Sequence, residues 1–101
     1  MTSYNKLNGT YTANNKELLI NVLRKEWGYK GVVMTDWGAI TKDKGDYYQC
    51  ANNGNDLIMP GDNSVVKQLI EDLKAGRLNK TSAQISVDRV LKLVRNSNFV
   101  K

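Results

Sequence analysis

The sequence predicts an α/β fold in which parallel strands are joined by crossover helices. Short apolar runs that suit strands alternate along the chain with longer segments whose apolar residues recur at helical spacing. The connections are short and include no linker or low-complexity tract. Strands that alternate with helices in this way favour parallel pairing, because the helix returns the chain to the same end of the sheet. The expected order is strand, helix, strand, helix, strand, helix, helix.

The first predicted strand, Met1–Tyr4, is so short that we expect it to be only the end of one. The first predicted helix covers Glu17–Trp27. It follows the Asn14–Asn15 pair, which can cap a helix, and precedes Gly28. The apolar residues that give this segment its helical spacing are Leu19, Val22, Leu23 and Trp27.

The second predicted strand is Gly31–Asp36, a β-branched apolar run that ends on a carboxylate. The polar stretch that begins at Thr41 predicts a loop and then a short helix around Tyr47–Ala51. The third predicted strand is Asp56–Met59, which Pro60–Gly61 terminates.

Two amphipathic helices complete the predicted chain. The first has its apolar side at Val65, Val66, Leu69, Ile70 and Leu73 and ends at Gly76. The second opens at Thr81–Ala83, with an apolar side made of Ile85, Val87, Val90, Leu91 and Val94.

Composition limits the chemistry that this chain can supply. Its 101 residues suit one modest domain or a piece of a larger one. There is no histidine, which excludes an imidazole base or ligand, and the single cysteine excludes an internal disulfide and a thiolate metal cage. Catalysis by this chain must therefore use carboxylates, hydroxyls, lysines or tyrosines.

Charge and hydropathy bear on the partners of the chain. The net charge is +5, but the basic residues are dispersed among acids and form no dense block, which favours a solvated surface over a nucleic-acid interface. No apolar run reaches the roughly 20 residues that span a membrane, so no membrane partner is expected. The first residues also lack the apolar core of a signal peptide, and we expect a cytoplasmic rather than a secreted location.

The strand ends are where function collects in parallel α/β folds, and Asp36 is the most informative residue there. A carboxylate after an apolar strand is costly unless it is hydrogen-bonded or used. Trp37 beside it offers a flat apolar face of the kind that stacks on sugar rings, which suits glycoside chemistry. Asp36 as the cap of the following segment, with Trp37 in the core, remains the alternative.

Other residues have simpler interpretations. Tyr4 taken alone suggests packing, and Cys50 suggests a small buried hydrophobe. Asp56 precedes a strand, which favours capping or backbone bonding. The segment from Asp56 to Gly61 also superficially resembles the phospho-acceptor turn of response-regulator receiver domains, a signalling alternative in which Asp56 accepts phosphate. Receivers need an acidic pair on a first strand and a lysine after the last, and neither is present.

Taken together, these segments resemble family 3 glycoside hydrolases of the β-glucosidase type. The similarity is collinear over nearly the whole chain, with Thr35 at a position where serine is commoner in the family. The matching segments are Met1–Gly9 with the end of the sixth barrel strand, Leu18–Gly31 with the following helix and turn, Val32–Ala39 with the nucleophile segment, Asn53–Gly61 with the last strand, and Gly76–Leu78 and Arg89–Leu91 with the region that closes the barrel.

The resemblance implies roles for four residues. Asp36 would be the nucleophile that forms a covalent glycosyl-enzyme, and Trp37 would line the sugar-binding cleft. Tyr4 matches a tyrosine beside the nucleophile, and Met1 matches a residue that lines the same subsite. The implied reaction is retaining hydrolysis of a terminal β-linked sugar from the non-reducing end, on a β-glucoside or oligosaccharide, with no metal or organic cofactor.

The resemblance also implies that residues 1–101 are a fragment of the catalytic barrel domain, roughly the last three βα units of a (β/α)8 barrel. The sugar-holding residues of earlier strands and the general acid/base would lie outside this chain. We therefore expect the isolated chain to be a folded fragment without catalysis. We also expect open strand edges at Met1–Tyr4 and Asp56–Met59, with self-association through them or closure of the helices over the uncovered face.

Overall fold

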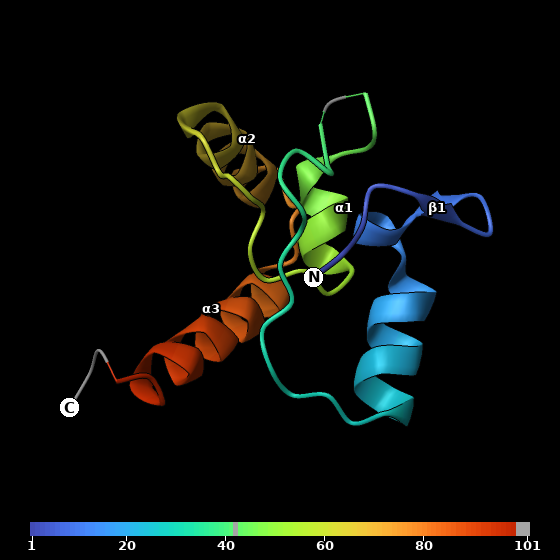
Figure 1. Cartoon of the computed structure of the whole chain (residues 1–101). Coiled ribbons are helices and arrows are strands. Elements are labelled where there is room, and N and C mark those ends of the chain that lie inside the picture. The colour runs from blue at the N-terminus through green and yellow to red at the C-terminus, as the bar shows by residue number, and fades with distance from the viewer. Residues whose placement is uncertain (42, 99–101) are drawn as a thin grey trace.

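The computed structural model describes residues 1–41 and 43–98, in which helices surround extended segments in the middle of the molecule (Figure 1). Helices η2, α1, α2 and α3 lie where helices are predicted, whereas the β1–β2 hairpin and the short 3₁₀ helix η1 are additions. The elements in chain order are β1 (Lys6–Leu7), β2 (Thr10–Tyr11), η1 (Thr12–Asn14), η2 (Glu17–Glu26), α1 (Tyr47–Asn52), α2 (Asn63–Lys74) and α3 (Lys80–Arg95).

Helix η2 has the wide turns of a π-helix. The amide of Trp27, for example, donates to the carbonyl of Val22, five residues earlier, at 2.9 Å. The side chain of Asn15 accepts the Leu18 amide at 3.0 Å, as expected of the asparagine pair, although the N-cap position itself is Lys16, one residue later, without a side-chain cap bond. The helix ends before Gly28, whose φ of +69° suits a residue without a Cβ atom.

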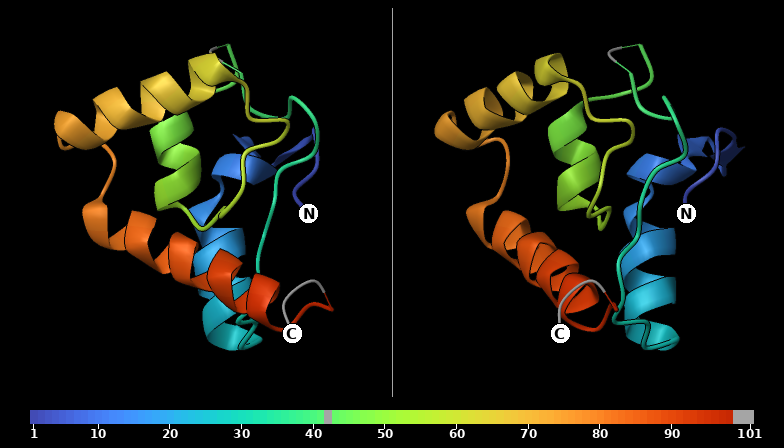
Figure 2. Two further views of the ribbon diagram at one scale, coloured as in Figure 1. Left: turned by 90° about the vertical axis from the view of Figure 1, so that its left-hand side faces the viewer. Right: turned by 60° about the vertical axis from the view of Figure 1, so that its left-hand side comes forward.

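Helices α2 and α3 pack on either side of the short helix α1 (Figure 2). Each begins at a polar side chain that accepts an amide of its own first turn. Asp62 accepts the amides of Ser64 at 3.0 Å and Val65 at 3.1 Å, and Asn79 accepts the amide of Ser82 at 3.0 Å. These contacts fix the two helix starts, and that of α3, at Lys80, lies one residue before the predicted opening at Thr81.

The β1–β2 hairpin is absent from the sequence prediction, although its turn carries a recognisable signal. Asn8 and Gly9 both have positive φ, at 51° and 82°, as the tight turn of a two-residue hairpin requires. Lys6 then pairs with Tyr11, and Leu7 with Thr10, in antiparallel register. An Asn-Gly pair is the strongest short sequence signal for such a hairpin, so this element could have been predicted.

The predicted parallel strands are present only as single parallel bridges. Thr2 pairs with Thr35, and Met34 pairs with Leu57. We call the three pieces of chain the first segment (residues 1–3), the middle segment (33–36) and the third segment (56–58). Their order and parallel direction agree with the prediction, but among residues 1–41 and 43–98 the regular strands are only β1 and β2.

A local irregularity explains why the middle and third segments form no ladder. The amides of Asp56 and Leu57 both donate to the carbonyl of Val33, at 2.8 and 3.3 Å, so two residues face one as in a β-bulge. Further along, the amide of Met59 donates to the side-chain oxygen of Thr35 at 2.9 Å instead of to a backbone carbonyl. Regular pairing is therefore interrupted on both sides of the Met34–Leu57 bridge.

The edge of the first segment, expected to be open over Met1–Tyr4, is covered at Ser3. The hydroxyl of Thr12 accepts the amide of Ser3 at 2.9 Å and donates to the carbonyl of Ser3 at 2.8 Å. A side chain thus takes the place of a neighbouring strand at this edge. Self-association of the chain stays a prediction.

The molecule has a small apolar core, and many large apolar side chains lie outside it. Ala13, Ile40 and Cys50 are buried with Tyr47 and Ile58 packed against them, which confirms Cys50 as a buried small residue. In α2 and α3, large apolar side chains stay exposed: Val66, Ile70, Leu73, Ile85, Val87, Leu91, Leu93 and Val94. Across residues 1–41 and 43–98, each helix is too short or too polar to cross a membrane.

Candidate active site

Asp36 lies at the end of the middle segment. The first segment holds the backbone of Asp36, and the third segment holds the backbone of Thr35. Its amide donates to the carbonyl of Thr2 at 3.1 Å, and the amide of Thr35 donates to the carbonyl of Leu57 at 3.0 Å. Because the middle segment is bonded on both sides, the direction in which the chain leaves it is fixed. This also fixes the position of the half-buried Asp36 carboxylate.

The Asp36 carboxylate begins a turn rather than a helix. Its Oδ1 accepts the amide of Trp37 at 2.8 Å, and its backbone carbonyl accepts the amide of Ala39 at 3.1 Å. The next helix in the described chain starts only at Tyr47, after Asp46. Asp36 therefore bonds the segment that follows it without capping a helix, and its local bonds leave the carboxylate at the mouth of a loop. The other half of that alternative, Trp37 in the core, is wrong, because Trp37 is 57% exposed.

Tyr4 lies beside this turn. Its hydroxyl donates to the carbonyl of Trp37 at 2.8 Å. Partial burial raises the pKa of Tyr4, and the hydrogen bond with Asp36 and the negative charge of that carboxylate raise it further. The phenol and the carboxylate are therefore neighbours, from residues 32 positions apart, and the phenol keeps its proton at neutral pH.

Trp37 and Met1 have different surroundings. The Trp37 side chain is 57% exposed, so its ring is open to solvent next to Asp36. Met1 is 73% exposed and lines a separate cavity together with Leu23 and Trp27 of the η2 region and Val33. Asp36 and Trp37 are not among the residues that line this cavity in the described chain, and a role for Met1 at a sugar subsite stays a prediction.

Thr35 is a site residue whose role the sequence interpretation missed. Its side chain is fully buried, and its hydroxyl accepts the amide of Met59 at 2.9 Å. The carbonyl of Met59 in turn accepts the amide of Gly38 at 3.1 Å. The third segment thus clamps the turn that carries Asp36. Thr35 supplies the hydroxyl that a serine would also supply at this position, with an additional methyl group in the interior.

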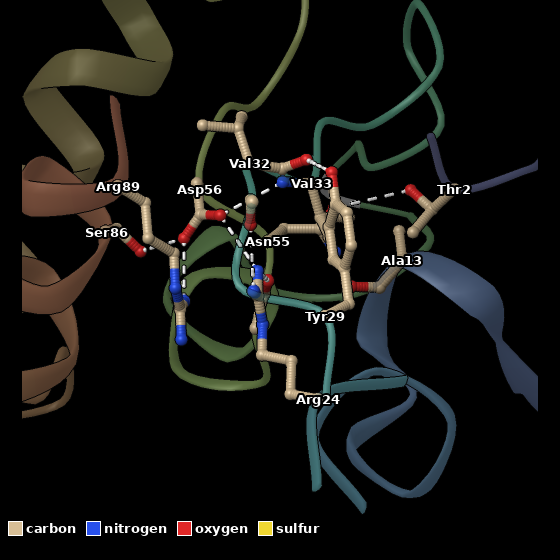
Figure 3. Close-up of polar contacts among 12 residues, drawn as sticks. Thr2, Ala13, Arg24, Tyr29, Val32, Val33, Asn55, Asp56, Ser86 and Arg89 are labelled. Atoms are coloured by element: carbon tan, nitrogen blue, oxygen red, sulfur yellow. Dashed lines mark hydrogen bonds and ion pairs between the residues drawn. The ribbon is translucent and has the colours of Figure 1, made fainter. Parts of the chain in front are cut away.

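Asp56 occupies the other end of the segments and has both oxygens bonded (Figure 3). Its Oδ2 accepts from Arg24 at 2.9 Å and from the amide of Val33 at 3.0 Å. Its Oδ1 accepts from Ser86 at 2.7 Å and from Arg89 at 3.0 Å. The prediction of backbone bonding for Asp56 is confirmed, whereas its two arginine partners were not foreseen.

This environment gives no support to the signalling alternative. The Asp56 side chain has no exposed surface, and its oxygens already face two guanidinium groups. A phospho-acceptor must be reachable by a phosphate donor, which this carboxylate is not. Within the part of the chain that the structure describes, no group of three or more cysteines and carboxylates gathers as a metal site would require.

The comparisons with known proteins agree on one family. The family described as "Glycosyl hydrolase family 3 N terminal domain" matches residues 1–93. The chain is 38% identical over 95 residues to thermostable beta-glucosidase B of Acetivibrio thermocellus and 41% identical over 95 residues to a beta-glucosidase of Rhizobium radiobacter. Both alignments cover 93% of this chain but only 12% and 11% of those relatives.

Solved structures give the same result. The Bifidobacterium adolescentis GH3 beta-glucosidase superimposes with a TM-score of 0.81 at 35% identity, over 92% of this chain and 13% of that one. Beta-glucosidase 3B from Thermotoga neapolitana, in a complex with glycerol, gives 0.79 at 40% identity, over 92% and 14%. These neighbours assign an α/β barrel-type fold. With its profile match over 93 of 101 residues, the chain belongs to glycosyl hydrolase family 3, within the N-terminal domain of that family.

Proposed function

We propose that this chain carries the nucleophile of a retaining β-glycosidase and that Asp36 is that nucleophile. The observation that supports the proposal best is the position of Asp36. Its carboxylate stands at the end of a central parallel segment, beside the Tyr4 hydroxyl and an exposed Trp37 ring. Catalytic groups of barrel enzymes collect at the ends of strands, because the scaffold there is fixed and the loops are free to vary.

The proposed reaction has two steps. An Asp36 oxygen attacks the anomeric carbon, the bond between that carbon and the leaving oxygen breaks, and an acid outside this chain protonates the leaving oxygen. Water then attacks the same carbon and gives a proton back to the group outside this chain, which now acts as a base, and the bond to Asp36 breaks. Retention requires the two carboxyl groups to lie about 5–5.5 Å apart, which a second carboxyl group from elsewhere in a longer protein would satisfy.

Tyr4 and Trp37 have supporting roles in this proposal. The Tyr4 hydroxyl donates to the Trp37 carbonyl, in the turn that carries the Asp36 carboxylate, and the charge of that carboxylate contributes to the raised pKa of the phenol. It would hold the carboxylate in line for attack. The Trp37 ring would stack on the apolar face of a sugar, as aromatic side chains with open faces do.

The relatives support a proposal for the substrate class. The relatives described above are beta-glucosidases, and Thermotoga neapolitana beta-glucosidase 3B has been solved in complexes with glucose. We propose a terminal β-linked glucoside or oligosaccharide as the substrate. The first, middle and third segments would be the last three strands of an eight-stranded barrel, a proposal that their parallel order supports.

A chimera provides the test. Residues 1–93 replace the matching segment of Thermotoga neapolitana beta-glucosidase 3B, which is 40% identical and has the same local fold. We expect the chimera to hydrolyse an aryl β-glucoside and Asp36→Asn to lower kcat by several orders of magnitude, because the amide keeps the shape but cannot attack. Asp43→Asn, at an exposed position, is the matched control. Equal rates for the two variants would contradict the assignment.

The isolated 101-residue chain should not hydrolyse the same substrate above background. General acid catalysis alone contributes roughly 10²–10⁴-fold, and the acid is proposed to lie outside this chain. A saturable rate that Asp36→Asn abolishes in the isolated chain would show that the chain is sufficient by itself.

A further inference from the structure

A cavity of about 300 Å³ lies between η2, α1 and α3, away from Asp36. Basic and hydroxyl side chains dominate its polar lining, and none of the described residues that line it is acidic. The polar side chains are those of Arg24, Lys25, Asn52, Ser82, Ser86 and Arg89. Figure 3 shows Arg24 and Arg89 on either side of the Asp56 carboxylate at this end of the segments.

The charges around the cavity do not balance. Arg24, Lys25 and Arg89 bring three positive charges, and Asp56 is the single carboxylate bonded to any of them in the described chain. Asp56 does not line the cavity. Its carboxylate contacts the two guanidinium groups from outside the cavity lining. Two positive charges are left over, and they attract an anion, although Lys25 contributes its charge from an exposed position.

Arg24 is buried rather than a solvated surface residue. Its side chain is 8% exposed, and its fork donates to the carbonyls of Gly31 and Gly54, each at 2.9 Å, as well as to Asp56. Its Nε nevertheless has no hydrogen-bond partner among the described residues. Burial lowers the pKa of Arg24, Asp56 opposes that shift, and the positive charge of Arg89 adds to it. A second anionic group would relieve this imbalance.

The remaining donors suit a tetrahedral oxyanion. Arg89 donates to Asp56 through Nη1 and is 22% exposed, so the rest of its fork can face the cavity. Ser82 lies in the first turn of α3, where the helix dipole favours negative charge, and its hydroxyl has no partner within the described chain. Guanidinium, ammonium and hydroxyl donors that line one cavity, as those of Arg89, Lys25 and Ser82 do here, are the groups that recognise phosphate.

From these observations we infer that the cavity between η2, α1 and α3 is a phosphate-binding site, independent of Asp36. The ligand is a phosphate group, either as the free ion or as part of a phosphorylated sugar. Arg89, Lys25 and Ser82 contact its oxygens, and Arg24 provides the buried positive charge behind them.

The test is calorimetric titration of the 101-residue chain with inorganic phosphate and, separately, with glucose 6-phosphate, at an ionic strength held constant with sodium chloride. We expect saturable binding with one site per chain. Lys25→Gln and Ser82→Ala should each weaken it about fivefold to tenfold, since each removes one donor to a charged group. Lys92→Gln, on α3 outside the cavity lining, is the matched control and should bind like the unchanged chain.

The two ligands distinguish the two sources of phosphate. Tighter binding of glucose 6-phosphate assigns a phosphorylated sugar, and equal binding assigns the free ion; both outcomes support the site. Circular dichroism verifies that each variant keeps its helices, and Ser82→Ala preserves the backbone amide that Asn79 accepts. Absence of saturable binding would overturn the inference. Equal weakening by Lys92→Gln would do the same, because it would indicate an adventitious ion only.

Discussion

Val33 and Asp56 are bonded to each other in both directions. The Asp56 carboxylate accepts the Val33 amide at 3.0 Å, and the Val33 carbonyl accepts the Asp56 amide at 2.8 Å. Val33 lies three residues before Asp36 on the same segment, so this double contact fixes the segment that carries the proposed nucleophile. Arg24 and Arg89 hold the Asp56 carboxylate in turn, which links η2 and α3 to that segment.

Asp56→Ala should therefore destabilise the chain strongly. Removing the carboxylate leaves two guanidinium groups, one of them buried, without their partner, which typically costs about 3–5 kcal/mol. Urea denaturation followed by circular dichroism measures the change in the free energy of unfolding. Asp43→Ala, at an exposed position, should change it little. A similar small loss for both variants would mean that the Asp56 cluster does not stabilise the fold.

Thr12→Val tests the protection of the first-segment edge. Valine keeps the shape of threonine but removes the hydroxyl that bonds the amide and carbonyl of Ser3. We expect a loss of about 1–2 kcal/mol and increased self-association, because the freed backbone groups can recruit another strand. Urea denaturation and light scattering over a concentration series measure the two effects. Thr10→Val, at an exposed hairpin position, should neither lower the free energy of unfolding nor increase self-association. Matching behaviour of the two variants would argue against edge protection by Thr12.

The sequence was informative about local structure. Helix starts and ends depend on nearby residues, such as the glycine after α2. The predicted bounds of η2 and α1, the end of α2 and the start of α3 agree with the structure within one or two residues. The π-helical turns of η2 and the bulge at Val33 depend on tertiary packing, which periodicity does not encode. They were therefore not predicted.

Some residues of the candidate site could be predicted and others could not, because only some of them have a signal in the neighbouring sequence. Asp36 and Trp37 are recognisable because they follow an apolar run, and Tyr4 because its segment resembles a family motif. Arg24 and Arg89 meet Asp56 across 32 and 33 residues, and each taken alone resembles an ordinary charge on a helix surface. Contacts of this range have no local signal, so the basic cavity beside them became evident only in the folded chain.

Cys50 should resist alkylation in the folded chain. Its side chain is fully buried, and burial raises the pKa of the thiol from 9.0 to about 12, although the side chain of Asn55 lowers it slightly. The thiolate is the reactive form, so iodoacetamide should react at a rate set by unfolding. Thr10→Cys in a Cys50→Ala background provides an exposed reference thiol. Equal rates for the two thiols, followed by mass spectrometry, would show that Cys50 is accessible.

The same pKa shift predicts how stability depends on pH. The folded chain retains the Cys50 proton to about pH 12, whereas the unfolded chain releases it above about pH 9. The contribution of this thiol to stability is therefore complete below pH 9 and is lost as the pH rises toward 12. Cys50→Ala should remove that part of the alkaline loss, which urea denaturation at a series of pH values measures. An unchanged pH dependence in Cys50→Ala would contradict the shift.

Trapping the covalent intermediate tests the assignment of Asp36 most directly. The chimera described above is incubated with a 2-deoxy-2-fluoro-β-glucoside that carries an activated leaving group. The fluorine destabilises the oxocarbenium-like transition states of both steps, while the leaving group keeps the first step fast, so the glycosyl-enzyme accumulates. Peptide mapping by mass spectrometry should locate one fluoroglucosyl group on Asp36, and Asp36→Asn should acquire none. A label on a different carboxylate, in a chimera that turns over substrate, would contradict the account.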